Sequence, residues 1–412
     1  MTASNLRLSG GVIPSKASPE TTPLSAPTAV RPSRSLRWRT MLAVGARMMF
    51  YDKLKFAGTL FGVIFAVILT TQQIGVFLGL LSKNTMFIDN AGADIWIAPP
   101  QTATLQAGKP VPMSALYAAR TTTGVAWAEP LLFGGGTISL PSGGSQAITL
   151  VGTEGPRWYG GPWNLVAGAA DALAQPDAMI FEDSQRDDLG GLNLGSVREV
   201  NGHRVVTSGF TWGLLPFAPS YAFAEYDYAR SLLGTPSDEA SFVLVGLRRG
   251  ADATRVARDI RAQTPTVDVM TTAEFHGRVV RYLLISTGIG ATTGASTAFG
   301  LIVGLVIVSL SMFSAVVDNI REFGTLKAIG CRNADLALML FVQSSIYGLL
   351  GSVIGLTQIT IIADAMRSPK LALVLPWPVF VGTPVLMVLL CGLASLLALS
   401  RVRKLEPAMV FR

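Results

Sequence analysis

The sequence predicts a helical membrane protein with four transmembrane helices, arranged as one plus three, and a large extracytoplasmic α/β domain inserted between the first and the second. Four segments, 56–82, 283–317, 336–363 and 371–400, are apolar and contain no Asp, Glu, Lys or Arg. Uninterrupted apolar runs of this length are typical of membrane-spanning helices. The long interval 83–270 has no such run and alternates between strand-like and helix-like patterns.

The distribution of charge indicates the topology. The chain carries a formal net charge of +7, but Asp and Glu outnumber Lys and Arg over residues 84–281. The basic excess therefore flanks the apolar segments, with clusters at 31–55 and 401–404. By the positive-inside rule, we expect both termini in the cytoplasm, residues 83–281 in the periplasm, and no nucleic-acid partner.

The two ends of the chain differ from the spans in composition. Residues 1–35 are rich in Ser, Thr, Pro and Gly, which predicts a disordered cytoplasmic tail. Residues 36–55 place apolar side chains at helical spacing among arginines, which predicts an amphipathic helix lying in the headgroup plane. A plain polar extension of the first span is the alternative. Residues 401–412 are expected to form a short cytoplasmic tail.

Local patterns place several elements inside the external domain. Runs in which apolar and polar residues alternate predict strands. An Asn-Gly or Gly-Gly pair between two such runs predicts a hairpin. A helical face of small and branched residues predicts a helix. The strands are expected at 94–98, 137–151 (a hairpin), 197–206 (a hairpin with Asn201-Gly202 at its tip) and 241–247, and the helix at 251–263.

A capping box at 271–274 is expected to begin a helix that continues into the second span. Unbroken from 271 to 319, this helix would measure roughly 70 Å, about twice a bilayer core. Residues 271–317 are therefore predicted to form a stiff stalk and the second transmembrane helix, provided that their glycines do not break the helix.

Two pairs of glycines in the second span favour close helix packing. Gly290 and Gly294, and then Gly300 and Gly304, are each four residues apart, a spacing that lets another helix approach closely. The partner is either the first span of the same chain or a second copy of the chain, and the sequence leaves both open.

The chain contains no motif that points to catalysis. It has no G-x-x-x-x-G-K-[ST] phosphate-binding loop, so we do not expect it to hydrolyse ATP. Its two histidines, His203 and His276, have no nearby cysteine, and no metal site is expected. Carboxylate pairs such as Glu182-Asp183 are interpreted as solvated surface. We therefore expect a non-catalytic protein.

A short polar segment, 318–335, separates the second and third spans and must lie at the cytoplasmic face. Its apolar residues Phe323, Leu326 and Ile329 recur every three positions, while its charged side chains remain for a partner. An ordinary amphipathic loop that only covers the spans is the alternative. The candidate contact residues are Arg321, Glu322, Phe323, Gly324, Leu326, Lys327, Ala328 and Gly330.

This segment, Glu-Phe-Gly-Thr-Leu-Lys-Ala-Ile-Gly at 322–330, resembles the cytoplasmic coupling segment of the FtsX/MacB-like (type VII) ABC transporter permease superfamily. The opening span and Asp-Ile-Trp-Ile-Ala-Pro-Pro at 94–100 look closest to the DevC-type branch. The resemblance implies a dimeric permease, as a homodimer or pseudo-dimer, working with ABC ATPase subunits. Those subunits would bind ATP and Mg, so no cofactor is expected in this chain.

For the DevC-type branch, the resemblance further implies a subunit in the bacterial inner membrane that transmits ATP-driven motion to a periplasmic adaptor. The adaptor would be joined to an outer-membrane duct, and the cargo would be an amphiphilic or lipid-like substrate. Membrane lipid is a further expected partner. Two other functions of the superfamily remain open. One is the release of lipoproteins, and the other is FtsX-like signalling that regulates an envelope enzyme.

Overall fold

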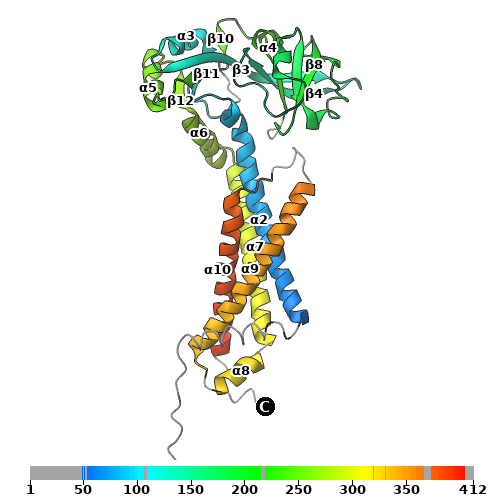
Figure 1. The fold of residues 1–412 in the computed structure, drawn as a ribbon, viewed down its shortest axis with the longest axis vertical. Helices are drawn as coiled ribbons and strands as arrows, with labels where there is room; N and C mark the ends of the chain where they lie inside the picture. The colour runs from blue at the N-terminus through cyan, green and yellow to red at the C-terminus, as the bar shows by residue number, and fades with distance from the viewer. Residues whose placement is uncertain are drawn as a thin grey trace, which may run out of the picture.

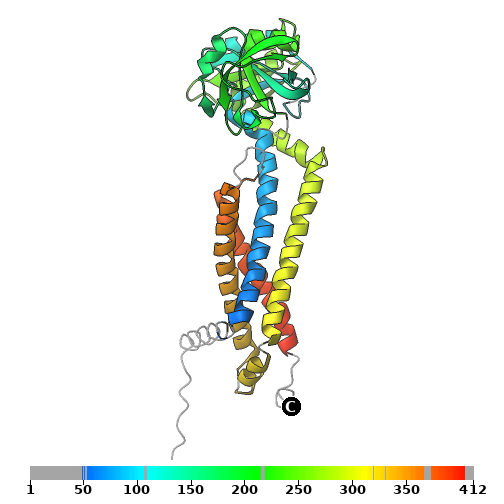
Figure 2. The same ribbon diagram turned by 90° about the vertical axis from the view of Figure 1, so that its right-hand side faces the viewer.

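The computed structural model describes residues 49, 51, 53–105, 109–214, 219–318, 320–329, 331–365 and 373–403. An external α/β domain occupies one end of the molecule and a bundle of long helices the other (Figures 1 and 2). The predicted tail 1–35 and nearly all of the predicted interfacial helix 36–55 lie outside the described residues.

Within the described ranges, four helices are long and apolar enough to cross a membrane, which confirms the predicted fold class. Helix α2 contacts both α7 and α9, and α10 contacts α9 and α7. Their order along the chain, one before the external domain and three after it, is the predicted one. The helices are α2 (Lys53–Asn90), α7 (Ile289–Asp318), α9 (Asn333–Ala365) and α10 (Trp377–Arg403).

The external domain has two lobes joined by the long strand β3 (Val125–Ser139). The first lobe is an antiparallel sheet in the order β12-β1-β11-β3, and helices α3 and α5 lie at its outer side (Figure 1). A two-stranded sheet of β2 and β10 lies beside it. These elements are β1 (Ile95–Ala98), β2 (Val111–Pro112), α3 (Met113–Thr121), β10 (Glu239–Ala240), β11 (Phe242–Leu247), α5 (Ala253–Gln263) and β12 (Asp268–Thr271).

The second lobe is a closed barrel. Strands pair around the ring β3-β4-β9-β6-β8-β7, and the pair Ile138↔Val200 closes it back onto β3. Closure leaves the ring without a free edge, which protects it from pairing with other chains. Its elements are β4 (Ser145–Thr153), β5 (Leu165–Ala167), η1 (Ala170–Ala174), β6 (Ala178–Glu182), η2 (Asp183–Gln185), β7 (Val197–Val200), β8 (His203–Thr211), β9 (Tyr221–Glu225) and α4 (Tyr226–Leu233).

Local sequence signals determine several of these elements as predicted. Asn201 and Gly202 both take positive φ, 49° and 82°, at the tip of the β7–β8 hairpin. The Asp252 side chain accepts hydrogen bonds from the amides of Thr254 and Arg255 at the start of α5. The capping box of Thr271 and Glu274 is present at the start of α6 (Thr272–Ile285).

The predicted unbroken helix from 271 to 319 is wrong. It is divided into α6, which ends at Ile285, and α7, which begins at Ile289. Gly288 between them has φ +70°, a left-handed conformation that glycine adopts without steric cost. The Thr287 hydroxyl donates to the Leu283 carbonyl at 2.9 Å and accepts from the Ile289 amide at 3.2 Å. Figure 2 shows α6 turning away from the axis of α7 at this point.

Candidate coupling site and its connection to the external domain

The predicted coupling segment forms a short helix, α8 (Ile320–Ala328), at the end of the bundle remote from the external domain (Figure 1). The Cys331 amide donates to the Leu326 carbonyl at 3.0 Å, the hydrogen bond typical of a Schellman helix end. The Arg332 amide donates to Asp335 Oδ2 at 3.2 Å, and this bond fixes the start of α9. The reversal between α7 and α9 is therefore a defined structural element.

Helix α8 presents both charge and apolar surface to the surroundings. Arg321 and Glu322 are exposed, Leu326 and Lys327 are half-buried, and Ile329 just beyond the helix is 77% exposed. A binding role for these residues stays a prediction. Among the other predicted contact residues, Gly324 is buried and Ala328 exposed, while the Phe323 side chain and Gly330 lie outside the described part of the chain.

The glycines of the second span take different positions. A Cβ added at Gly304 would lie 3.0 Å from Thr70 Oγ1 of α2, and one at Gly300 would lie 2.8 Å from Gln73 of α2. These two glycines therefore pack inside the chain. Gly294 faces open space, and Gly290 lies against the backbone of Leu284 at the helix break. A dimer seam at these positions stays a prediction.

Helix α2 is packed closely on its other side as well. Gly351 of α9 faces Val63 and Gly355 of α9 faces Val67, with no room for a Cβ at either glycine. Val63 and Val67 are fully buried. Glycines on two different helices thus let α7 and α9 approach α2 from both sides. The packing role of Gly351 and Gly355 was not foreseen, although small residues four apart are its sequence signal.

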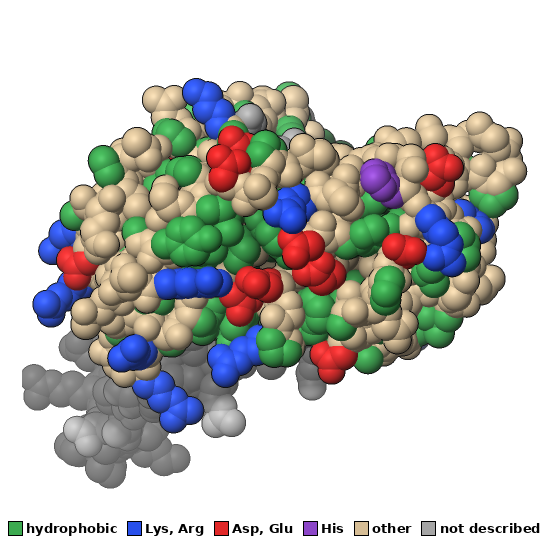
Figure 3. Space-filling view, turned by 90° about the horizontal axis from the view of Figure 1, so that it is seen from above, with side chains coloured by type: hydrophobic (Ala, Val, Ile, Leu, Met, Phe, Trp, Pro, Cys, Tyr) green, Lys and Arg blue, Asp and Glu red, His purple; other side chains and the backbone are tan. Residues whose placement is uncertain are grey.

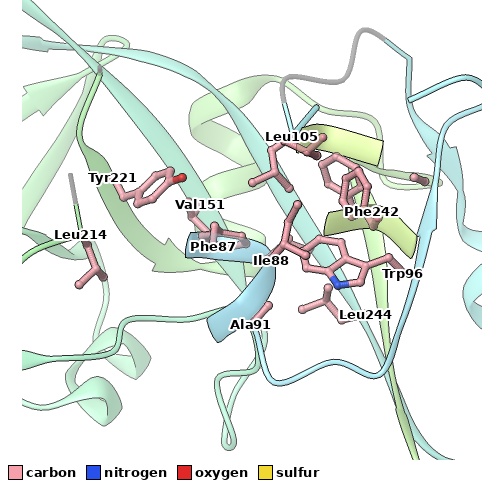
Figure 4. Close-up of a cluster of buried hydrophobic side chains, with 14 of the residues drawn as sticks. Phe87, Ile88, Ala91, Trp96, Leu105, Val151, Leu214, Tyr221, Phe242 and Leu244 are labelled. Carbon is pink, nitrogen blue, oxygen red and sulfur yellow. The ribbon is translucent and has the colours of Figure 1, made fainter. Parts of the chain in front are cut away.

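Helix α2 continues out of the bundle and ends inside the external domain. Its 38 residues correspond to about 57 Å at 1.5 Å per residue. Near its end, Phe87 and Ile88 are buried in the core of the domain (Figure 4). The continuous rod that joins the bundle to the domain is therefore α2, and not the segment 271–319 where the sequence placed it.

Phe87 contacts both lobes. Its ring centroid lies 5.4 Å from those of Phe133 and Tyr221, at the second lobe and its junction, and 6.3 Å from that of Trp96 in the first lobe. Edge-on aromatic pairs at these distances are favourable. The end of α2 is therefore packed against both lobes. Sequence reasoning missed Phe87, because a phenylalanine after a polar Ser-Lys-Asn-Thr run resembles the start of a domain more than the end of a rod.

Helix α6 is joined to the same end of α2. His276 Nδ1 lies 2.8 Å from Asp89 Oδ1 of α2, at the surface. The Phe275 ring lies 5.3 Å from that of Trp96. The first lobe therefore rests on α2 directly and also on α6, and α6 continues into α7 through the break at Gly288.

Glu182 departs from its interpretation as a surface carboxylate, because its side chain is fully buried. It accepts hydrogen bonds from the Thr211 and Ser184 hydroxyls and from the Gly213 and Leu214 amides, at 2.8 to 3.1 Å. Burial raises the pKa of Glu182, and these hydrogen bonds oppose the rise. With all its oxygens bonded to its own lobe, Glu182 has a structural role.

The residues that the structure describes contain no group of His, Cys, Asp and Glu side chains that could hold a metal ion. The structure combines an exposed short helix at one end of the bundle, closely packed long helices, and a continuous helix that ends in the core of the external domain.

Comparison with protein families gives two matches that together cover most of the chain. The MacB-like periplasmic core domain matches residues 56–263, and the FtsX-like permease C-terminal domain matches residues 294–407. The chain belongs to the FtsX/MacB-like family of ABC transporter permeases. The first match runs from α2 to the end of α5, and the second spans α7, the coupling segment and the last two helices.

Individual relatives are distant. An uncharacterized ABC transporter permease of Methanocaldococcus jannaschii is 24% identical over 148 residues, 34% of this chain and 36% of the relative. One of Mycobacterium tuberculosis is 26% identical over 127 residues, 31% of this chain and 35% of the relative. The chain thus matches about a third of the length of these relatives.

Two solved external domains are similar to part of the chain. The periplasmic region of MacB from Actinobacillus actinomycetemcomitans covers 45% of this chain and 92% of its own, at 11% identity and a TM-score of 0.35. The extracellular domain of the transporter YknZ from Gram-positive bacteria covers 43% of this chain and 98% of its own, at 17% identity and a TM-score of 0.32.

Proposed function

We propose that the chain is the permease subunit of an ABC-type exporter and transmits ATP-driven motion of separate ATPase subunits to its periplasmic domain. The observation that carries the proposal is the continuity of α2, which runs from the cytoplasmic end of the bundle to the core of the external domain. A path of this kind is needed for movement of the ATPase subunits to reach the external domain. The predicted spans contain no charged side chain, which argues against an ion or proton route as the alternative.

The proposed path begins at α8. Arg321, Glu322 and Lys327 contact the ATPase, which binds ATP and Mg, and the apolar edge of α8 fits a groove on it. Movement of α8 displaces α7, and α7 displaces α2 where Gly300 and Gly304 hold the two helices together. Helix α2 then moves both lobes through Phe87.

The remaining partners follow from the same proposal. The outer face of the external domain carries acidic, basic and hydrophobic side chains (Figure 3). We assign this face to a periplasmic adaptor that leads to an outer-membrane duct, in the manner of DevC-type exporters, with an amphiphilic cargo. A second permease copy completes the assembly in the inner membrane, with both termini cytoplasmic.

The test replaces Glu322 and Lys327 with alanine. The double variant is expected to insert in the membrane at the wild-type level and to lose most of its export and its stimulation of the co-purified ATPase. Lys53→Ala, an exposed residue at the same end of the bundle but outside α8, serves as the control and is expected to export normally. Normal export by the Glu322/Lys327 variant would contradict the coupling role.

Identification of co-purified subunits separates the proposed function from the other two functions of the superfamily. Pull-down from mild detergent is expected to yield an ATPase together with a periplasmic adaptor. Recovery of a soluble lipoprotein carrier would favour lipoprotein release, and recovery of a cell-wall hydrolase would favour signalling.

A further inference from the structure

A cavity of about 300 Å³ lies between α2 and α7 at the end of the bundle where the coupling helix begins. The side chains of Lys55 and Thr59 line it from α2, and those of Leu310, Ser311, Ser314 and Asp318 line it from α7. Because the share of one water in the liquid is about 30 Å³, the space would hold on the order of ten waters or one small polar group.

With both termini cytoplasmic, as in the proposed function, the cavity lies at the level of the inner-leaflet headgroups. Lys55 is in the first turn of α2, and Asp318 is the last residue of α7. Helix α8 begins at Ile320, so an occupant that touches Asp318 lies next to the proposed coupling helix. Lys55, Ser314 and Asp318 are exposed, whereas Thr59 is buried, so the cavity opens outward from a closed inner wall.

The chemistry of the lining selects among lipids. It provides one cation, one anion and three hydroxyls, with the two charges on different helices. The Ser314 hydroxyl donates to Asp318 Oδ2 at 3.5 Å, and Thr59 is hydrogen-bonded to Tyr347. A phosphate is therefore stabilised by the Lys55 ammonium together with the Ser311 hydroxyl, and a primary ammonium by the Asp318 carboxylate. An anionic headgroup would leave the charge of Asp318 unpaired, and a quaternary ammonium has no N–H to donate to it.

The surface beside the cavity suits acyl chains. Leu310 in the lining is 66% exposed, and Phe61, close to Thr59 on α2, is 70% exposed. Large apolar side chains at the outside of a transmembrane bundle face the hydrocarbon of the bilayer. A lipid whose headgroup fills the cavity therefore has apolar surface for its chains on both helices.

We propose that this cavity binds the headgroup of one inner-leaflet phospholipid that carries a primary ammonium, as in phosphatidylethanolamine. Its phosphate lies at Lys55 and its ammonium at Asp318, and the lipid joins α2 to α7 directly beside the coupling helix. The site is independent of any cargo or ATPase, so its test is independent of the proposed function.

The experiment measures which lipid the full-length chain retains. The protein is delipidated in detergent, exposed to mixed micelles containing phosphatidylethanolamine, phosphatidylcholine and phosphatidylglycerol with identical acyl chains, and examined by native mass spectrometry. Wild type is expected to retain one phosphatidylethanolamine in preference to both other lipids. Asp318→Asn is expected to reduce this preference over phosphatidylcholine about tenfold, the effect of losing one hydrogen bond to a charged group.

Matched variants keep the result interpretable. Asp318→Glu keeps the carboxylate and is expected to keep the preference, which separates a lost ligand from a damaged fold. Lys55→Gln is expected to weaken retention of all three lipids, whereas Lys53→Gln, two residues earlier and outside the lining, is expected to have no effect. Equal retention of phosphatidylethanolamine and phosphatidylcholine by wild type, or an undiminished preference in a folded Asp318→Asn variant, would overturn the proposal.

Discussion

Helices α2 and α7 both connect the bundle to the external domain, but they do so in opposite ways. Helix α2 enters the domain without interruption and ends in its core. Helix α7 stops at Ile289, and the chain reaches the domain only after the left-handed Gly288 and a separate helix, α6. A rigid link and a hinged link therefore act side by side on the same domain.

The two helices also differ in how much of each is covered. Helix α2 packs against α7 and α9, and α7 is the least buried of the four candidate spans. A rod that transmits displacement has to be held along its length, since a helix free on all sides bends away from a load. Under the proposed function, α2 is therefore the better candidate for the transmitting helix.

The largest effect is expected where the rigid link meets the domain. Phe87→Ala removes a fully buried ring that contacts both lobes, and such truncations cost about 3–5 kcal/mol. The matched change on α7 is Phe299→Ala, a ring that is mostly exposed and is expected to shift stability by less than about 0.5 kcal/mol. Thermal unfolding of both variants in the same detergent compares them. Similar losses would contradict the distinction between the two helices.

Packing between the helices gives the next largest effect. Gly304→Val places two methyl groups against Thr70 and Ala66 of α2, and overpacking of this kind costs roughly 1–3 kcal/mol. Gly294→Val fills open space and is expected to leave the stability of the single chain unchanged. Unfolding midpoints test both changes. Loss of a dimer in Gly294→Val alone, measured by light scattering, would place the seam at Gly294, while equal destabilisation by both would contradict the assigned packing.

Much of the architecture could be predicted because its determinants are local. The apolar spans are visible from composition, and the Asn201-Gly202 turn and the Thr271 capping box each depend on adjacent residues. The extension of α2 past residue 82 was hidden by polar residues. Asn84 and Asn90 satisfy their side chains on their own helix, through the carbonyls of Leu80 and Met86, so polar sequence did not end the helix.

Non-local features could not be derived from the sequence. Closure of the barrel depends on the pairing of Ile138 with Val200, and neither position carries a signal for its partner. Buried Glu182 resembled surface because its bonding partners, such as Thr211 and Gly213, come from another strand and the loop after it. The coupling segment is recognisable from its motif. The sequence does not reveal that the helix packed beside α7 continues as far as Phe87, because this depends on α2 being unbroken to Asn90.

Stiffness of the two links can be compared directly. Val76→Gly with Leu78→Gly softens the part of α2 between the bundle and the domain, at about 1 kcal/mol of helix stability for each glycine. Ser286→Gly with Thr287→Gly alters the existing break and is expected to preserve export. ATP hydrolysis without export of cargo is expected only for the transporter complex that contains the α2 variant. Equal export by the two variants would show that α2 is not the transmitting element.

The smallest effect is expected from a change of pH, which lowers the stability of the external domain without altering the sequence of either helix. Burial, and then the nearby Glu154 carboxylate, raise the pKa of Glu129 to about 7. Below about pH 4.5 this residue is protonated in the folded and unfolded chains alike and has no effect. As the pH rises from there to about 7, the unfolded chain releases the proton first, so the domain loses stability; above pH 7 the loss is complete.

Because α2 ends inside the domain, this loss should reach α2 and not α7. Hydrogen exchange at the amides around Phe87 is expected to be faster at pH 7.5 than at pH 5.5, after correction for the intrinsic dependence of exchange on pH, while exchange in α7 is unchanged. Glu129→Gln should abolish the difference, and Glu199→Gln, at an exposed position in β7, should keep it. A pH effect of equal size in both helices would mean that the hinge at Gly288 transmits as well as the rod does.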